Sequence, residues 1–150
     1  MRPDLVPSPD DPFPGDFVTA AEAVHVAELR AALRRFLHRS ERIARLSGLT
    51  PQRHLLLLLI KGAPDGSETS TVTELTKRLH LAQSSVTELV DRAVAAGLVE
   101  RRPSSSDSRV VELRLAPEGE RRLARSFRDH YEERTRLIDT LLEHGVFPEE

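Results

Sequence analysis

The sequence predicts a mainly helical α+β fold in which one short β-hairpin lies between helical segments. Apolar residues recur at helical spacing over residues 19–48 and again over residues 117–143. Over residues 98–115 the hydrophobic period changes from helical to two, which is the pattern of paired strands. A chain of 150 residues is long enough for one cored domain, and the sequence contains no internal repeat. We therefore expect a single domain over residues 17–150.

The composition is typical of a soluble globular protein and excludes several kinds of site. Hydrophobic residues make up 39% of the chain and charged residues 31%, which disfavours a disordered chain. The absence of cysteine excludes disulfides, thiol redox sensing and Cys-ligated metal centres. Aromatic residues make up only 4%, too few for the stacking platforms that bind single-stranded nucleic acid. The longest apolar run, residues 55–60, is far shorter than the ~20 residues of a membrane span, and the N-terminus lacks a signal pattern, so we expect a cytoplasmic protein.

Residues 1–16 differ in composition from the rest of the chain. They contain five of the ten prolines together with four aspartates. Proline fixes φ and has no N–H to donate to a helix or a sheet. We therefore expect an extended Pro/Asp-rich tail before the domain.

A long helix is predicted to begin after residue 18. Residues 19–22, Thr-Ala-Ala-Glu, form a capping box, in which the Thr19 and Glu22 side chains satisfy backbone N–H groups. Gly48 is the expected stop. The apolar residues of this helix follow a heptad-like spacing, which favours packing along another helix, either within the fold or across a dimer. They are Val26, Leu29, Leu33, Phe36 and Ile43.

A second helix is predicted in the stretch that follows. Thr50 and Pro51 suit the N-cap and the first position of a helix, because proline needs no hydrogen-bond acceptor there. The helix contains the apolar run 55–60 and is expected to end at Gly62. Residues 63–70 are rich in Gly, Pro, Asp and Ser and form a loop, with strand-like residues at its end.

A second capping box, Thr-Val-Thr-Glu at residues 71–74, predicts a short third helix. After a turn over residues 80–83, Ser84 or Ser85 is expected to cap a fourth helix, which Gly97 ends. The helical spacing of apolar residues divides this helix into two faces. Its buried face is Val86, Leu89, Val90, Ala93 and Val94, and its outward face is Ser84, Ser85, Thr87, Glu88, Asp91 and Arg92.

Residues 98–103 and 109–115 are predicted to pair as a hairpin with a polar tip at residues 104–108. From Pro117 a final helix is expected to continue to about Leu142. In the second strand Val111, Leu113 and Leu115 are expected on one side, alternating with Val110, Glu112 and Arg114. The apolar set of the final helix is Leu123, Phe127, Tyr131, Leu137, Ile138 and Leu141.

Two short helices joined by a tight turn and followed by a hairpin form the winged helix-turn-helix plan, here over residues 50–115. The second helix of such a pair fits the major groove of B-DNA, and residues near its start reach base edges. An arginine at the hairpin tip, here Arg109, can enter the minor groove; alternatively, its pair with Asp107 only stabilises the turn. Residues 70–115 contain seven basic and six acidic residues, so a DNA-binding surface has to come from placement and not from bulk charge. The candidate DNA-contacting residues are Thr73, Lys77, Gln83, Ser84, Ser85, Thr87, Glu88, Arg92, Arg101, Arg102, Asp107 and Arg109, with Arg78 as a further phosphate binder.

The ordered set of segments resembles the MarR family, the multiple-antibiotic-resistance regulators. Residues 84–92, SSVTELVDR, followed by residues 96–101, AGLVER, are similar to the family's recognition helix and first wing strand. Residues 107–109, Asp-Ser-Arg, resemble its wing motif, and residues 117–119, Pro-Glu-Gly, resemble the start of its last helix. The resemblance covers residues 46–123 by motif.

The resemblance implies a homodimer joined by the helices at residues 19–48 and 117–143. It also implies sequence-specific binding to a pseudo-palindromic operator in double-stranded DNA, as a repressor of transcription that a small molecule releases. An effector pocket is expected to be mostly apolar, and an Arg or His anchor in it suits a small aromatic acid. No cofactor is expected. The residues expected at the dimer interface are Val26, Leu29, Leu33, Phe36, Leu137, Ile138 and Leu141.

The chain departs from the family pattern at three positions. Glu88 lies on the DNA-facing side, where the family often has a basic or small residue, and Ser108 occupies the middle of the wing motif, which is often basic. Ala116 stands where a threonine usually caps the last helix. Glu88 either closes a capping box with Ser85 or accepts a hydrogen bond from a cytosine, and we expect the cap, because a lone carboxylate among few basic groups would contact DNA poorly.

Two alternatives from other classes are considered beside DNA binding. One is a winged-helix adaptor that binds a protein, and the other is a metal-dependent enzyme or metallosensor that uses the six histidines. No two histidines are four residues apart, as a helical metal site requires, so we expect no metal. His130, beside Glu133 or Arg134, is interpreted as a helix-surface residue. The sequence contains no nucleophile–base set, phosphate loop or carboxylate pair, and we do not expect an enzyme.

Overall fold

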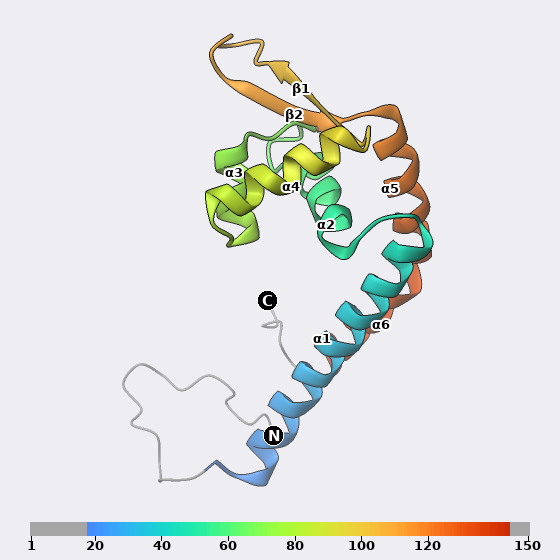
Figure 1. The fold of residues 1–150 in the computed structure, drawn as a ribbon. Coiled ribbons are helices and arrows are strands. Elements are labelled where there is room, and N and C mark those ends of the chain that lie inside the picture. Colours follow the sequence, from blue (N-terminus) through green and yellow to red (C-terminus); the bar gives the residue numbers. More distant parts are fainter. Residues whose placement is uncertain (1–17, 145–150) are drawn as a thin grey trace, which may run out of the picture. The chain divides into compact units, whose positions relative to one another are not determined.

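The computed structural model describes residues 18–144, which are mostly helical with one two-stranded sheet, as the sequence predicts (Figure 1). They belong to two compact units, one formed by residues 40–131 and the other by residues 18–39 with 132–144. The predicted tail at residues 1–16 lies outside the described residues. No helix in the described part of the chain is both long and apolar enough to span a membrane. In chain order the elements are α1 (Ala20–Leu46), α2 (Pro51–Lys61), α3 (Val72–Leu79), α4 (Gln83–Ala95), β1 (Val99–Pro103), β2 (Val111–Leu115), α5 (Pro117–Asp129) and α6 (Tyr131–Glu143).

The predicted caps start the first three helices. At α1 the Thr19 N–H donates to Glu22 Oε2 at 2.9 Å, and the Glu22 N–H donates to Thr19 Oγ1 at 3.3 Å. At α2 the Arg53 N–H donates to Thr50 Oγ1 at 3.2 Å. The capping box at residues 71–74 is complete at the start of α3. Each cap satisfies backbone donors that the first helical turn leaves without a partner.

The predicted glycine stops are also confirmed. Gly48 and Gly97 follow α1 and α4 with φ of +73° and +72°, in the left-handed region that glycine adopts without steric cost. The next N–H groups, of Leu49 and Leu98, each donate at 3.0 Å to a carbonyl five residues earlier. This hydrogen bond closes the helix end and turns the chain towards the next element.

The expected cap of α4 is wrong. Helix α4 begins at Gln83, with Ala82 in an extended conformation as its N-cap residue and no side-chain capping bond. The Val86 N–H donates to the Ala82 carbonyl at 3.1 Å, so the first turn forms before either serine could act as a cap. Ser84 and Ser85 therefore lie inside the first turn, and a capping box between Ser85 and Glu88 is excluded.

The core of the 40–131 unit is built around α2. Leu56, Leu57 and Ile60 of its apolar run are fully buried, and burial of each such side chain contributes about 1.5–3 kcal/mol. The predicted inner face of α4 packs against α2 and α3, with Val94 only partly buried. The other elements supply further buried side chains, namely Leu75, Val86, Leu89, Val90, Ala93, Leu98, Val99, Leu113, Leu115 and Leu123.

Strands β1 and β2 form an antiparallel hairpin, with Val99 opposite Leu115 and Pro103 opposite Val111. Ser70 bridges Leu113 through two backbone hydrogen bonds of 3.0 and 2.8 Å, which confirms the strand-like end of the loop at residues 63–70. Leu113 and Leu115 are buried, but Val111 is 50% exposed, contrary to the predicted alternation. Val111 pairs at the outer end of the hairpin, beyond the buried part of the strand.

The predicted final helix is divided in two at His130. The His130 ring approaches the Ser126 carbonyl with Nδ1 at 2.6 Å, the same oxygen that accepts the His130 backbone N–H at 3.0 Å. Helix α5 ends at Asp129 with His130 as its C-cap residue, and α6 begins at Tyr131. His130 is only 4% exposed, so its interpretation as a helix-surface residue is wrong.

Candidate nucleic-acid interface

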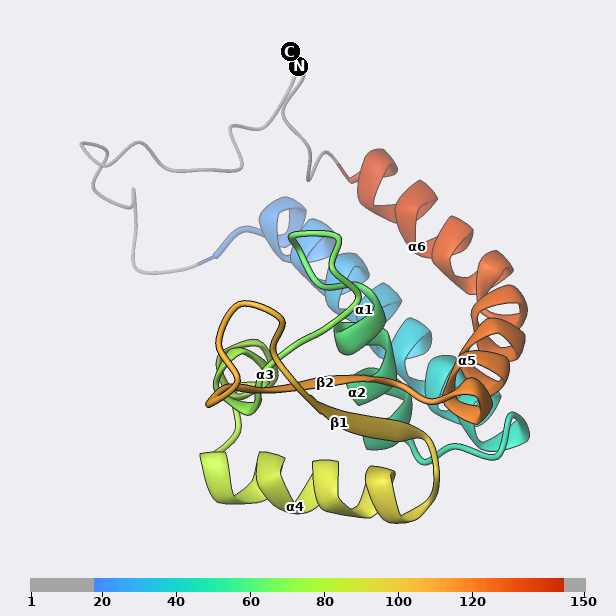
Figure 2. The same ribbon diagram turned by 90° about the horizontal axis from the view of Figure 1, so that it is seen from above.

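Helices α3 and α4 form a helix-turn-helix pair. Leu75 of α3 and Val86 of α4 are both fully buried, and the two helices pack directly against each other. His80 closes α3 in the left-handed conformation, with φ of +53°, which makes the turn to α4 short. Figure 2 shows α3 nearly end-on where α4 is seen along its length, so the helices cross at a large angle. This arrangement leaves one long face of α4 exposed.

The first turn of α4 presents small hydroxyl side chains to solvent. Ser84, Ser85 and Thr87 are exposed, and the structure gives none of their hydroxyls a partner within the described residues. The first N–H groups of α4 also lack a side-chain cap. Uncapped N–H groups at a helix start favour an anion such as a phosphate. The beginning of α4 is therefore free to donate and accept hydrogen bonds.

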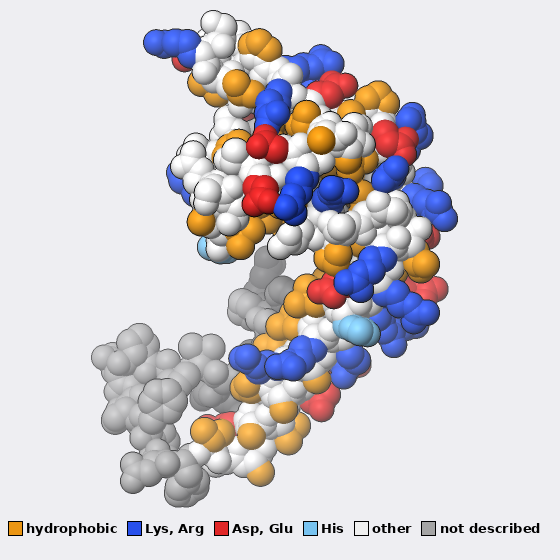
Figure 3. Space-filling model, in the orientation of Figure 1, with side chains coloured by type: hydrophobic (Ala, Val, Ile, Leu, Met, Phe, Trp, Pro, Cys, Tyr) orange, Lys and Arg blue, Asp and Glu red, His pale blue; other side chains and the backbone are white. Residues whose placement is uncertain are grey.

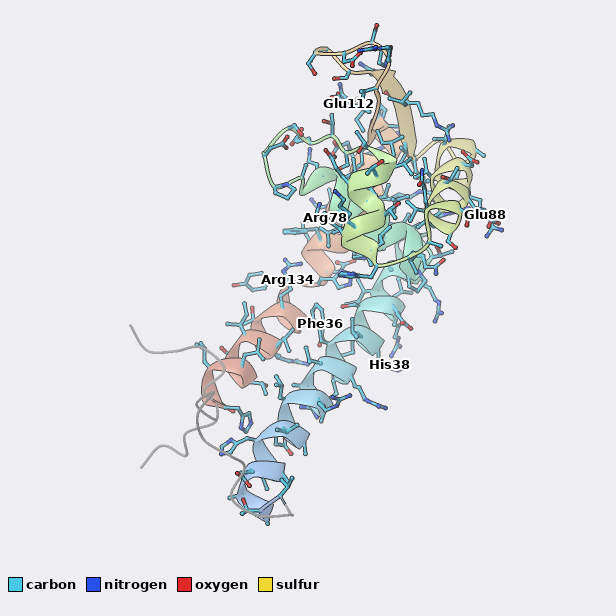
Figure 4. The ribbon with its side chains drawn as sticks, turned by 90° about the vertical axis from the view of Figure 1, so that its left-hand side faces the viewer. Phe36, His38, Arg78, Glu88, Glu112 and Arg134 are labelled. Carbon is cyan, nitrogen blue, oxygen red and sulfur yellow. The ribbon has the colours of Figure 1, made fainter. Side chains whose placement is uncertain are left out.

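Two arginines beside the exposed face of α4, Arg92 and Arg101, are held in ion pairs. Glu88 projects from the outer side of α4 (Figure 4) and pairs with Arg92, one helical turn later. Asp91 pairs with Arg101 of β1 and so connects α4 to the wing. Over α4 in Figure 3, basic and acidic side chains are interleaved. The face is therefore nearly neutral, as the charge count predicts.

The hairpin tip is a closed turn that presents Arg109. The Ser104 N–H donates to the Val110 carbonyl at 2.8 Å, and the Val110 N–H donates to the Asp107 carbonyl at 3.0 Å. Asp107 accepts from the Arg109 backbone N–H at 3.0 Å and from Arg109 Nε at 3.2 Å. Hydrogen bonds from the Arg109 side chain and backbone hold the pKa of the Asp107 carboxyl below its usual value. Because the Arg109 side chain is still 90% exposed, Asp107 orients it without covering it.

The remaining candidate residues are either exposed or engaged by other groups of the protein. Thr73, Lys77 and Gln83 are exposed on α3 and at the start of α4. Arg102 of β1 pairs with Glu100 at 2.9 Å. Arg78 is directed inward, and its guanidinium donates to the Leu59 carbonyl at 2.8 Å and to the Gly62 carbonyl at 3.3 Å. Arg78 thus caps the end of α2, a structural role for a side chain that the sequence indicates only as a phosphate binder.

Sequence reasoning missed the Asp91–Arg101 pair and the burial of His130. Asp91 belongs to the predicted outward face of α4, but its partner lies ten residues later in a different element. Only the return of the chain after Gly97 brings the two together. The sequence offers one signal, which is that two residues of opposite charge lie on either side of the turn predicted at Gly97.

The residues expected at a dimer interface lie on α1 and α6. Val26, Leu33 and Ile138 are 51%, 40% and 51% exposed, although they are apolar. Within the unit formed by residues 18–39 and 132–144, Arg39 Nη1 donates to both carboxylate oxygens of Glu133 at 3.1 and 3.2 Å. The other expected interface residues are partly buried and are Leu29, Phe36, Leu137 and Leu141.

Comparisons with known proteins agree with this geometry. Residues 47–110 match a family model described as the MarR family. The uncharacterized HTH-type transcriptional regulator YsmB of Bacillus subtilis (strain 168) is 32% identical over 108 residues, which cover 69% of this chain and 71% of that protein. The HTH-type transcriptional repressor YetL of the same strain is 31% identical over 84 residues, which cover 56% of this chain and 49% of that protein.

Solved structures show the same fold. Sco3205, a MarR family transcriptional regulator from Streptomyces coelicolor described in complex with DNA, superposes with a TM-score of 0.65 at 23% identity, over 85% of this chain and 80% of that one. AbsC, another MarR family regulator from Streptomyces coelicolor, gives a TM-score of 0.64 at 17% identity, over 88% of this chain and 83% of that one. The sequence relatives and the winged helix-turn-helix together show that this chain belongs to the MarR family of transcriptional regulators.

Proposed function

We propose that the chain is a sequence-specific DNA-binding repressor that acts as a homodimer on a pseudo-palindromic operator and is released by a small-molecule effector. The observation that carries this proposal is the pairing of two exposed features in one unit. These are the hydroxyl-rich start of α4 and a wing whose Arg109 is oriented by Asp107 and is 90% exposed. Its role is regulatory and cytoplasmic, with no catalytic step and no cofactor.

In the proposed complex α4 enters the major groove and the wing follows the neighbouring minor groove. Short hydroxyl side chains at the start of α4 let the backbone approach base edges closely, and they can both donate and accept. Arg109 then contacts the minor groove, where narrow A·T tracts concentrate negative potential. Lys77 and Arg102 contact phosphates at the edges of the surface. Sco3205, which has the same fold, is described in complex with DNA, and this supports DNA binding as the function.

Dimerisation is proposed through α1 and α6. Several large apolar side chains on these helices are exposed in the single chain, among them Leu37 at 59% and Leu142 at 60%. An interface with a second copy of the chain would cover apolar side chains of this kind. Replacement of Leu33 by Asp is expected to give monomers in sedimentation experiments, and a wild-type chain that sediments as a monomer at micromolar concentration would contradict the dimer.

The repressor role is supported by the relationship to YetL, which is named a repressor. Release by an effector is proposed from membership of the family, with a small aromatic acid as the ligand class. A cavity of about 130 Å³ between α1 and α6 is lined by Phe36 and Leu137 together with Arg35, Arg39 and Arg136. It is smaller than the ~300 Å³ of a typical ligand pocket, so we do not assign the effector to it.

The main competing function is a winged-helix adaptor that binds a protein, which the nearly neutral face of α4 favours. Salt dependence distinguishes the two, because DNA binding releases counterions from phosphates and weakens as salt rises. We expect the affinity for a generic duplex to fall at least about 100-fold between 50 and 200 mM salt, the response of a dimer that makes about four or more phosphate contacts. The same titration compares Arg109→Ala with a matched control, Arg125→Ala. Arg125 is exposed on α5, outside the proposed surface. An association that ignores salt would favour the adaptor.

A further inference from the structure

Two histidines from distant parts of the sequence stack inside the 40–131 unit. The rings of His54, on α2, and His130, between α5 and α6, have centroids 4.8 Å apart and planes inclined by 18°. His130 is buried, and His54 is partly buried. No residue of the proposed DNA-binding surface is part of this pair, so its chemistry is separate from DNA contact.

Each ring nitrogen of His130 faces a backbone carbonyl. Nδ1 lies 2.6 Å from the Ser126 carbonyl oxygen, and Nε2 lies 3.1 Å from the Ser40 carbonyl oxygen on α1. A carbonyl oxygen can only accept, and a neutral imidazole has one N–H, so it can satisfy one of these contacts. Only the imidazolium, with a proton on both nitrogens, makes both hydrogen bonds. His130 is also the C-cap residue of α5, where the helix dipole favours a positive charge.

His54 is suited to remain neutral while its neighbour takes up a proton. Burial, and then the proximity of His130, lower the pKa of His54 to about 4. Three charged side chains close to the contacts along the chain do not pair with either ring. Arg39 pairs with Glu133, and Glu41 and Asp129 are exposed. His54 is therefore neutral until the pH is well below the usual range of histidine, and the two carbonyl contacts make His130 the ring for which a second proton completes a hydrogen bond.

We propose that the stacked His54–His130 pair is a proton-operated latch. Uptake of one proton from solvent by the His130 ring completes the hydrogen bonds to both carbonyls and ties Ser40 to the end of α5, and loss of that proton breaks one of the two bonds. The chain leaves the 40–131 unit at Ser40 and at Tyr131, next to the two ends of the latch. Protonation of His130 therefore sets whether one or two hydrogen bonds connect Ser40 to the end of α5, close to the two points at which the chain leaves this unit. Its effect on DNA affinity rests on the proposed function.

The direct test observes the ring nitrogens of the full-length protein, labelled with ¹⁵N in histidine. We expect both His130 nitrogens to be protonated at about pH 6 and only one at about pH 8.5, with a neutral His54 at both values. Loss of signals in H130Q assigns the ring, and H54F, which keeps a stacked ring but no second imidazole, is expected to retain the two-proton signal at about pH 6. A His130 ring with one protonated nitrogen at both pH values, or a proton that resides on His54, would overturn the proposal.

The second measurement uses affinity for a generic duplex at the same two pH values and constant salt. We expect the wild type to bind about two- to tenfold more tightly at the lower pH, the equilibrium equivalent of one hydrogen bond, because a fixed junction needs less ordering on binding. H130Q should lose this change, and H38Q, which alters an exposed histidine, should keep it. A pH dependence that persists unchanged in H130Q would overturn the link to DNA. A chain that binds no duplex at any pH would contradict the proposed function, whereas the nitrogen signals would still decide the latch.

Discussion

Replacement of Glu88 by Gln is expected to tighten binding of this chain to every DNA duplex. In the free protein Glu88 pairs with Arg92, and both side chains are mostly exposed, at 63% and 66%. An exposed pair of this kind contributes at most about 0.5 kcal/mol to stability, so the fold should tolerate its loss. The amide removes the negative charge and frees the Arg92 guanidinium to contact a phosphate.

The size of the effect follows from counterion release. The substitution frees one cation on each protomer, and each neutralised phosphate adds about 0.9 to the slope of log affinity against log salt. A fourfold rise in salt, from 50 to 200 mM, should then reduce the advantage of the variant about 3.5-fold for each protomer bound. Because phosphates are the same in every sequence, the gain should not depend on the duplex.

Fluorescence anisotropy titrations at three salt concentrations measure this slope. The matched control is Glu132→Gln, which removes the carboxylate of another exposed Glu–Arg pair with the same spacing, Glu132 and Arg136 at 3.7 Å on α6. The control should leave the slope unchanged. An equal slope for Glu88→Gln and wild type would refute the release of Arg92. A selective loss of about 1–3 kcal/mol at one base pair would show instead that Glu88 contacts a cytosine.

Three further predictions concern stability, measured by urea unfolding. Gly119→Ala should destabilise the fold by about 2–3 kcal/mol, because a Cβ there would lie 2.1 Å from the Leu98 carbonyl oxygen and force α5 away from the start of β1. Unchanged stability would show that α5 shifts freely. His80→Gly should stabilise by about 0.5–1 kcal/mol, since φ of +53° lies in the left-handed region, where glycine avoids the steric cost of a Cβ, and a loss of stability would contradict that reasoning. The pKa of His54 is about 4 in the folded state and close to 6.5 in the unfolded state, so the unfolded chain binds more protons in between, and stability should fall as pH drops from about 6.5 to 4. His54→Phe should flatten that fall, and a wild-type curve that is already flat would contradict the pKa.

Much of the fold could be predicted because its signals are local. The capping residues at Thr19, Thr50 and Thr71 and the glycines after α1 and α4 act within one helical turn, and all were in the expected places. A local signal also explains the error at the start of α4, where Ser84 or Ser85 is predicted as the cap. Two serines are good capping residues, but Ala82 in an extended conformation ends the turn just before them.

The contacts that sequence could not predict join distant residues. His130 has the spacing of a helix-surface residue, and only the packing of α2 and α1 beside it turns it into a buried partner of His54 and Ser40. The guanidinium of Arg78 likewise donates to the carbonyls of Leu59 and Gly62 at the end of α2, a contact with a distant element that the sequence does not indicate. A side chain's partner depends on which element lies next to it, and periodicity along one helix does not contain that information.

The most direct test of the proposed function is selection of bound sequences from a pool of random duplexes. A dimer that inserts α4 of each protomer into the major groove should enrich an inverted repeat, with half-sites centred about one helical turn, ~10 base pairs, or a multiple of it apart. Arg109→Ala should bind the selected site about 1–3 kcal/mol more weakly while the repeat persists. Failure to enrich any sequence, or enrichment of a single unrepeated motif, would contradict a homodimer that recognises a pseudo-palindromic operator through α4 and the wing.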